Sequence, residues 1–91
     1  MELNLDNKKV LITGASRGIG LSIAESFLKE NAMTCIVSRG SDNLYKNEKK
    51  LQDIYGLNSS FASKCDCTNL DSLNNLKDQI KEKWNCLDIL I

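Results

Sequence analysis

The sequence contains no histidine, so its four cysteines are the only residues that could supply the Cys and His ligands of a typical zinc site. The closest two, Cys65 and Cys67, are separated by one residue. Zinc sites use wider spacings such as C-x-x-C and usually add further Cys or His ligands, so we expect no metal site. The alternative is that the cysteines are buried, reduced thiols, because free cysteine is commonly buried and a reducing compartment disfavours disulfides. If residues 61–67 form a strand, Cys65 and Cys67 share one face and Asp66 points to the other.

Proline, low-complexity tracts, internal repeats and long apolar runs are also absent. No run approaches the roughly 20 apolar residues of a membrane helix, and the first ten residues lack the apolar segment of a secretory signal. We therefore expect a cytoplasmic protein. The 12 basic and 12 acidic residues cancel, so no overall field favours nucleic acid or an anionic membrane as a partner. A chain of 91 residues suffices for one small domain, residues 1–91, of modest stability.

Apolar residues alternate between strand-like and helix-like spacing along the chain. Four short apolar or alternating segments predict strands, at residues 8–13, 33–38, 59–65 and 87–91. Helical spacing predicts three helices between them. The residues expected on their inner faces are Ile19, Ile23, Ala24, Phe27 and Leu28 in the first, Leu44, Leu51 and Ile54 in the second, and Leu73, Leu76, Ile80 and Trp84 in the third.

Capping residues set the expected limits of these helices. The first spans about Gly18–Glu30. The second is capped by Ser41 and Asp42 and runs to about Tyr55, where Gly56 ends it, and the third begins near a capping box made by Thr68 and Asp71. Helices between strands require parallel pairing, so the order βαβαβαβ predicts an α/β fold with part of a doubly wound parallel sheet.

Three of the five glycines, Gly14, Gly18 and Gly20, fall in the turn from the first strand to the first helix. The carboxyl ends of parallel strands form a binding crevice, and a helix N-terminus offers unpaired N–H groups and partial positive charge to a phosphate there. Gly14 would permit the tight turn, Gly18 the approach of a pyrophosphate, and Gly20 close packing on the sheet. The spacing differs from G-x-G-x-x-G and from the P-loop, and a structural turn without a ligand is the alternative.

The stretch TGASRGIG at Thr13–Gly20 resembles the TGxxxGxG signature of the short-chain dehydrogenase/reductase family. CDCTN at 65–69 resembles the family's D-V-T/S segment, and LDILI at 87–91 resembles the start of its L-D-x-L-V-N-N-A-G strand. This resemblance covers essentially the whole chain. It implies a Rossmann-type fold and an oxidoreductase that transfers hydride between a dinucleotide and a carbonyl or alcohol substrate, with a homo-oligomer expected for the full-length enzyme.

The same resemblance implies roles for residues outside the glycines. Ser16, Arg17 and Ile19 would contact the pyrophosphate and the adenosine ribose. Asp66 would accept a hydrogen bond from adenine, and Cys67, in place of the usual aliphatic residue, would offer its backbone or pack on the adenine ring. The alternative for Asp66 is a carboxylate that caps a helix or stabilises a loop.

Residues after the second strand bear on the choice between NAD and NADP. An NAD site has an acidic residue about 20 residues after the glycines, to hold the ribose 2′-hydroxyl. Ser38 stands at that place, followed by Arg39. Serine does not repel a 2′-phosphate, and Arg39 and Arg17 attract it with planar guanidinium groups. Although each arginine alone could be a solvated surface charge, the set favours NADP(H) over NAD(H).

The family's catalytic Ser, Tyr and Lys have no counterpart here, so we expect no catalytic residues and no dehydrogenase activity from the 91 residues alone. Tyr45 and Lys49 formally satisfy Y-x-x-x-K, but they fall on the helix that flanks the adenosine end. Residues 87–91 would form an edge strand with exposed apolar surface. The alternative to an oxidoreductase portion is therefore a stand-alone nucleotide-binding module, or an interaction fragment that pairs this edge with a partner.

Overall fold

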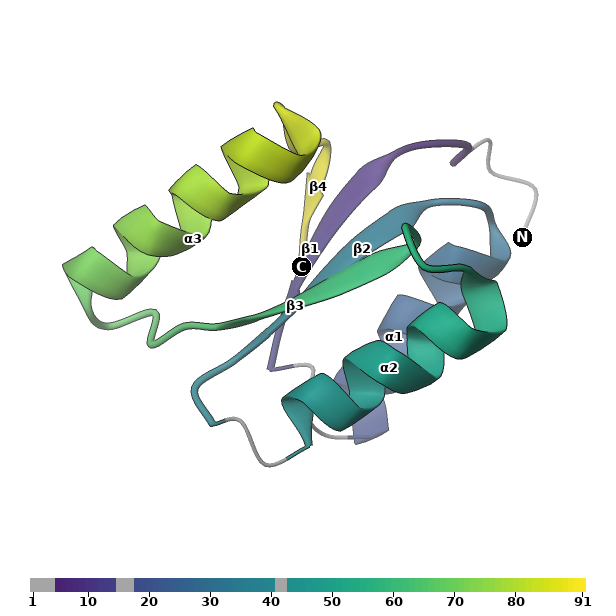
Figure 1. Cartoon of the computed structure of the whole chain (residues 1–91), viewed down its shortest axis with the longest axis horizontal. Coiled ribbons are helices and arrows are strands. Elements are labelled where there is room, and N and C mark those ends of the chain that lie inside the picture. The colour runs from purple at the N-terminus through teal and green to yellow at the C-terminus, as the bar shows by residue number, and fades with distance from the viewer. Residues whose placement is uncertain (1–4, 15–17, 41–42) are drawn as a thin grey trace.

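A computed structural model describes residues 5–14, 18–40 and 43–91. In this part of the chain, strands and helices alternate from β1 to β4 (Figure 1). The strands are all parallel, in the order β3-β2-β1-β4. This arrangement confirms the predicted α/β, Rossmann-type sheet. The elements are β1 (Lys9–Thr13), α1 (Gly18–Lys29), β2 (Met33–Ser38), α2 (Leu44–Tyr55), β3 (Ser60–Lys64), α3 (Leu70–Trp84) and β4 (Ile89–Leu90).

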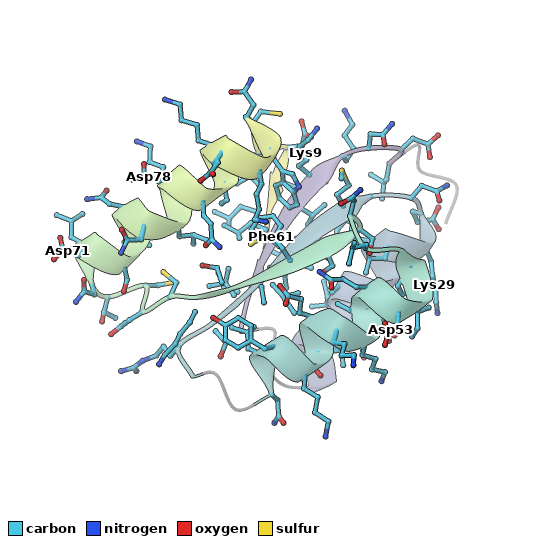
Figure 2. The ribbon with its side chains drawn as sticks, in the orientation of Figure 1. Lys9, Lys29, Asp53, Phe61, Asp71 and Asp78 are labelled. Carbon is cyan, nitrogen blue, oxygen red and sulfur yellow. The ribbon has the colours of Figure 1, made fainter. Side chains whose placement is uncertain are left out.

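Helices cover both faces of the sheet, with α1 and α2 on one face and α3 on the other (Figure 1). Alternate residues of each strand point to opposite faces, so the central strand β2 sends Ile36 toward α1 and α2, and Cys35 and Val37 toward α3. On the α3 side the rings of Phe61 and Trp84 pack edge to face, with centroids 4.8 Å apart. In Figure 2, Phe61 lies between the sheet and α3.

The inner faces of α1 and α2 follow the predicted pattern except at one end of each helix. Ala24 and Leu28 are buried in α1, but Ile19, in its first turn, is 81% exposed. In α2, Leu44 and Leu51 are buried, whereas Ile54 is 57% exposed. The prediction for Ile54 was wrong because a helix turns about 100° per residue, which brings Tyr55, four residues after Leu51, closer to the buried stripe.

The ends of α2 and α3 differ in part from the predicted caps. Ser41 and Asp42 lie outside the described residues. The N-cap of α2 is Asn43, which makes no side-chain capping bond, and Gly56 ends the helix as predicted, with φ +111°. The expected Thr68–Asp71 capping box is wrong, because Asn69 caps α3 instead.

In that cap the Asn69 Oδ1 accepts a hydrogen bond from the Ser72 N–H at 3.1 Å. Leu76, Ile80 and Trp84 of α3 are buried as predicted, but Leu73 is 38% exposed. Asp71 and Asp78 are exposed and point away from the sheet (Figure 2).

The two edges of the sheet differ in how their backbone groups are covered. On the β3 edge, the Ala62 N–H donates to the Glu48 carboxylate at 2.6 Å, and the Gln52 side-chain amide donates to the Ser60 carbonyl at 2.7 Å. Two side chains of α2 thus occupy positions that a further strand would use. On the opposite edge β4 is only two residues long, and Leu90 is 65% exposed, as expected for an edge strand.

Candidate nucleotide-binding site

A cleft of about 670 Å³ opens where β1, β2 and β3 end. Parallel strands present their carboxyl ends on one side of a sheet, so the segments that follow these three strands converge there. We call this cavity the strand-end cleft. Its lining residues are Thr13, Gly14, Val37, Ser38, Arg39, Gly40, Asn43, Cys65, Asp66, Cys67 and Thr68.

The turn after β1 contributes the glycines that the sequence singled out. Gly14 has φ +67°, a left-handed conformation that glycine adopts without strain, as predicted for a tight turn. Gly18 is the first residue of α1, so the unpaired N–H groups of this helix start there, and Gly20 is buried. Ser16 and Arg17, predicted to contact the cofactor, lie outside the described residues. Ile19 is on the exposed side of the same turn.

The end of β2 places a buried hydroxyl beside an exposed cation. The side chain of Ser38 accepts a hydrogen bond from the Gly40 N–H at 3.3 Å, which helps to fix the turn after the strand. Arg39 is 78% exposed on the rim of the strand-end cleft. No carboxylate stands at position 38, so the end of β2 carries positive rather than negative charge.

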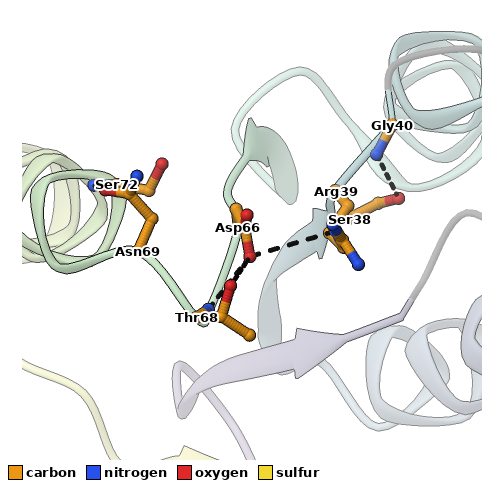
Figure 3. Close-up of polar contacts among 7 residues, drawn as sticks. All are labelled: Ser38, Arg39, Gly40, Asp66, Thr68, Asn69 and Ser72. Atoms are coloured by element: carbon orange, nitrogen blue, oxygen red, sulfur yellow. Dashed lines mark hydrogen bonds and ion pairs between the residues drawn. The ribbon is translucent and has the colours of Figure 1, made fainter.

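Asp66 crosses from the end of β3 toward that cation (Figure 3). Its Oδ1 accepts hydrogen bonds from the Thr68 N–H at 3.0 Å and the Thr68 hydroxyl at 2.7 Å, and lies 3.9 Å from the Arg39 Nε. These two hydrogen bonds and the Arg39 charge lower the pKa of Asp66 below its ordinary value of 3.8. The carboxylate is therefore ionised at neutral pH and can accept a further hydrogen bond.

The predicted alternative for Asp66, a loop carboxylate, describes part of what it does. An aspartate that bonds to the backbone N–H two residues on forms an Asx-turn, and the sequence Asp-Cys-Thr carries that signal. The approach of Arg39 to Asp66 was missed by the sequence analysis. It joins residues 27 positions apart, through the pairing of β2 with β3.

Two of the four cysteines lie in the strand-end cleft and differ in exposure. β3 ends at Lys64, so Cys65 and Cys67 do not share a strand face: Cys65 is buried and Cys67 is exposed. The expectation that all four thiols are buried was wrong, because Cys86 is exposed as well. Burial, together with the charges of Cys67 and Asp66, raises the pKa of Cys65, and burial raises that of Cys35 to about 12.

Comparison with known proteins identifies the family. The family model described as short chain dehydrogenase matches residues 8–91. This chain belongs to the short-chain dehydrogenase family. Its fold and its glycine-rich turn are thus those of a family of oxidoreductases that bind a nucleotide cofactor.

Curated short-chain dehydrogenase relatives match nearly all of the chain. A dehydrogenase/reductase SDR family protein 7-like of Dictyostelium discoideum is 34% identical over 93 residues, which are 99% of this chain and 29% of the relative. The enoyl-(acyl-carrier-protein) reductase (NADH) FabI of Rickettsia prowazekii is 39% identical over 88 residues, 96% of this chain and 33% of the relative. The chain therefore spans about a third of the length of these relatives.

Solved structures of the family are similar in both backbone and extent. L-sorbose reductase from Gluconobacter frateurii, solved with NADPH and L-sorbose, superimposes with a TM-score of 0.89 at 30% identity, covering 99% of this chain and 34% of the reductase. Hydroxysteroid dehydrogenase from Escherichia coli gives a TM-score of 0.86 at 33% identity, covering 96% and 36%. One of these proteins is an NADH-dependent reductase and another was solved with NADPH, so the shared fold accommodates both dinucleotides.

Within residues 5–14, 18–40 and 43–91, no three His, Cys, Asp or Glu side chains are grouped so that they could hold a metal ion. No helix in that part of the chain is both long and apolar enough to cross a membrane.

Proposed function

We propose that the strand-end cleft binds the adenosine end of NADP(H), and that the chain is the cofactor-binding portion of a reductase. The whole enzyme would transfer hydride between NADP(H) and a carbonyl or alcohol substrate, as a homo-oligomer. The residues proposed to hold the cofactor are Gly14, Ser16, Arg17, Gly18, Ile19, Gly20, Ser38, Arg39, Asp66 and Cys67.

The observation that carries this proposal is the position of Arg39 on the rim of the strand-end cleft. A 2′-phosphate brings about two negative charges to the end of β2, where Arg39 is largely exposed and the residue directly before it is a serine, not an acid. Its guanidinium contacts Asp66 at 3.9 Å through Nε, which is beyond hydrogen-bond distance, so its N–H groups can still turn to a phosphate. An adenine lying between these strands would meet the Asp66 carboxylate on the β3 side.

Titration of NADPH and NADH against the wild-type chain and Arg39→Asp tests the preference. Reversal of one charge next to a phosphate should weaken NADPH binding by about a hundredfold, as expected for loss of a charge-assisted bond plus repulsion. NADH binding should change by less than about threefold. Lys8→Asp makes the same charge change before β1, at the opposite end of the sheet, and should leave both affinities as they are. An unchanged NADPH-to-NADH ratio in Arg39→Asp would refute the proposal.

We also propose that the 91 residues do not transfer hydride by themselves. Tyr45 and Lys49 lie on α2, both are exposed, and neither lines the strand-end cleft. The test is NADPH oxidation by the purified chain with a panel of aldehydes and ketones, with Tyr45→Phe as the control. Turnover that Tyr45→Phe abolishes would overturn this proposal and would make Tyr45 the proton donor.

A further inference from the structure

Two thiols line the strand-end cleft, those of Cys65 and Cys67, and the proposed function gives neither of them a chemical reaction. Cys65 is buried at the end of β3, where its backbone N–H donates to the Ser38 carbonyl at 2.8 Å and ties it to β2. Cys67 follows two residues later and is exposed, and both residues line the strand-end cleft. One thiol is thus fixed in the wall of the cleft, and the other is open to solvent beside it.

We propose that Cys65 and Cys67 are a peroxide-sensitive dithiol, whose disulfide weakens dinucleotide binding in the strand-end cleft. This inference rests on the proposed function for its effect on binding, but not for its chemistry. The exposed Cys67 is the thiol that a hydroperoxide in solution can reach. The buried Cys65, two residues away in the same cleft, is the thiol that can then react with it.

The reaction balances with hydrogen peroxide as the oxidant. The Cys67 sulfur attacks one peroxide oxygen, the O–O bond breaks, and a sulfenic acid and one water form. The Cys65 sulfur then attacks the Cys67 sulfur, the S–O bond breaks, and the hydroxyl group leaves as a second water with the Cys65 proton. Two thiols are oxidised to one disulfide while one peroxide is reduced to two waters. Because the raised pKa of Cys65 keeps that thiol protonated, the second step should be the slower one.

The effect on binding follows from the residue between the two thiols. Asp66 is held in place by the N–H and hydroxyl of Thr68, in a turn that immediately follows Cys67. A bond from Cys67 to the fixed Cys65 draws this segment toward the wall of the cleft and displaces the Asp66 carboxylate. Loss of one hydrogen bond to adenine corresponds to roughly tenfold weaker binding.

Trypsin separates this pair from the other cysteines, so mass spectrometry can locate the disulfide. Cleavage after Lys64 and Lys77 gives one peptide, residues 65–77, that holds both thiols, whereas Cys35 and Cys86 fall in two other peptides. The purified chain is treated with hydrogen peroxide, alkylated with N-ethylmaleimide and digested. Peptide 65–77 should be two hydrogens lighter and carry no alkyl group, and dithiothreitol should restore both alkylation sites.

NADPH titration before and after peroxide measures the consequence, with circular dichroism to verify that the fold is retained. Affinity should fall about tenfold and recover with dithiothreitol. The same response is expected from Cys86→Ser, which removes the exposed thiol outside the cleft. No peroxide response is expected from Cys67→Ser.

Two results would overturn the inference. One is a peptide 65–77 that keeps both alkylation sites while Cys86 is oxidised, and the other is a Cys65–Cys67 disulfide that leaves NADPH affinity unchanged. Failure of the fully reduced chain to bind NADPH is a different result. It would refute the proposed function and the predicted loss of affinity together, and the peptide map would still decide whether the disulfide forms.

Discussion

Replacement of Gly18 by alanine should separate the demands of folding from those of the cofactor. Gly18 starts α1, and among the described residues no atom lies within 4 Å of the position that its Cβ would take. Its φ is not in the left-handed region, so alanine fits the backbone there. If folding were the only constraint, alanine would be the better residue, because glycine is less favourable in a helix.

Substitution by alanine should change the stability of the chain in opposite directions at Gly18 and Gly14. Gly18→Ala should stabilise the chain by about 0.5 kcal/mol and raise its melting temperature by about 2–4 °C. Gly14 has φ +67°, where a side chain destabilises the folded chain by about 1–2 kcal/mol. The lower conformational entropy of the unfolded alanine variant offsets about 0.4–1 kcal/mol of this loss. Gly14→Ala should therefore lose about 1 kcal/mol and lower the melting temperature by about 4–8 °C.

Thermal unfolding by circular dichroism and NADPH titration of the same samples provide the assay. Under the proposed function, the methyl group of Gly18→Ala stands where the pyrophosphate approaches, and affinity should fall at least about tenfold even as stability rises. Ser22→Ala is the control, because Ser22 is exposed on the same helix and does not line the strand-end cleft. A Gly18→Ala chain that is destabilised, or one that binds NADPH as the wild type does, would refute the reasoning.

Three further predictions concern the cleft, the sheet edge and the core. The pKa of Asp66 is lower in the folded chain than its ordinary value of 3.8, so the ionised carboxylate stabilises the fold above that pH, and this stabilisation is lost as the pH falls through the folded pKa. The difference in melting temperature between wild type and Asp66→Asn should therefore shrink below about pH 4. Glu48→Ala removes the acceptor from the β3 edge and should lose about 1–3 kcal/mol in urea unfolding and increase aggregation by light scattering, whereas Asp53→Ala, exposed on the same helix, should change neither. Leu51→Ser should lose at least about 2 kcal/mol or unfold the chain, and Ile54→Ser should stay within about 0.5 kcal/mol of wild type in the same urea titration.

The strands were predictable from the sequence because burial on both faces leaves nearly continuous apolar runs. Residues 33–38 fill β2 from end to end, since this strand lies between β1 and β3 and under helices on both sides. Ile54 shows the limit of the same reasoning. Ile54 and Tyr55, three and four residues after Leu51, lie on opposite sides of the buried stripe of this helix. Tyr55 is the one of the two that packs against the core.

The candidate site was predictable where a local rule applied and not where a contact joined distant segments. Gly14 could be assigned because a tight turn after a strand needs a residue in the left-handed conformation. Its φ of +67° depends on the local turn and not on contacts with distant segments. The exposure of Cys67 depends on where β3 ends. Three more strand residues would have placed its thiol on the same side as that of Cys65, and the alternating pattern does not mark the end at Lys64.

Under the proposed function, the contrast between Ser38 and Arg39 indicates which of the two residues would decide the cofactor preference. Ser38 is buried, and its hydroxyl accepts the Gly40 N–H, so it is committed to the turn and presents little surface to a ribose. Arg39 is exposed and carries a charge that a 2′-phosphate can reach. One relative is an NADH-dependent reductase and a similar solved structure holds NADPH, so the backbone does not itself select a dinucleotide. Under the proposed function, the selection comes from charge at the rim of the cleft, where Arg39 attracts a phosphate and Asp66, on the other side of the same ion pair, repels it. Because Asp66 also receives two hydrogen bonds from Thr68, its carboxylate stays in the turn when Arg39 moves to a phosphate, and the cation is the group that changes partner.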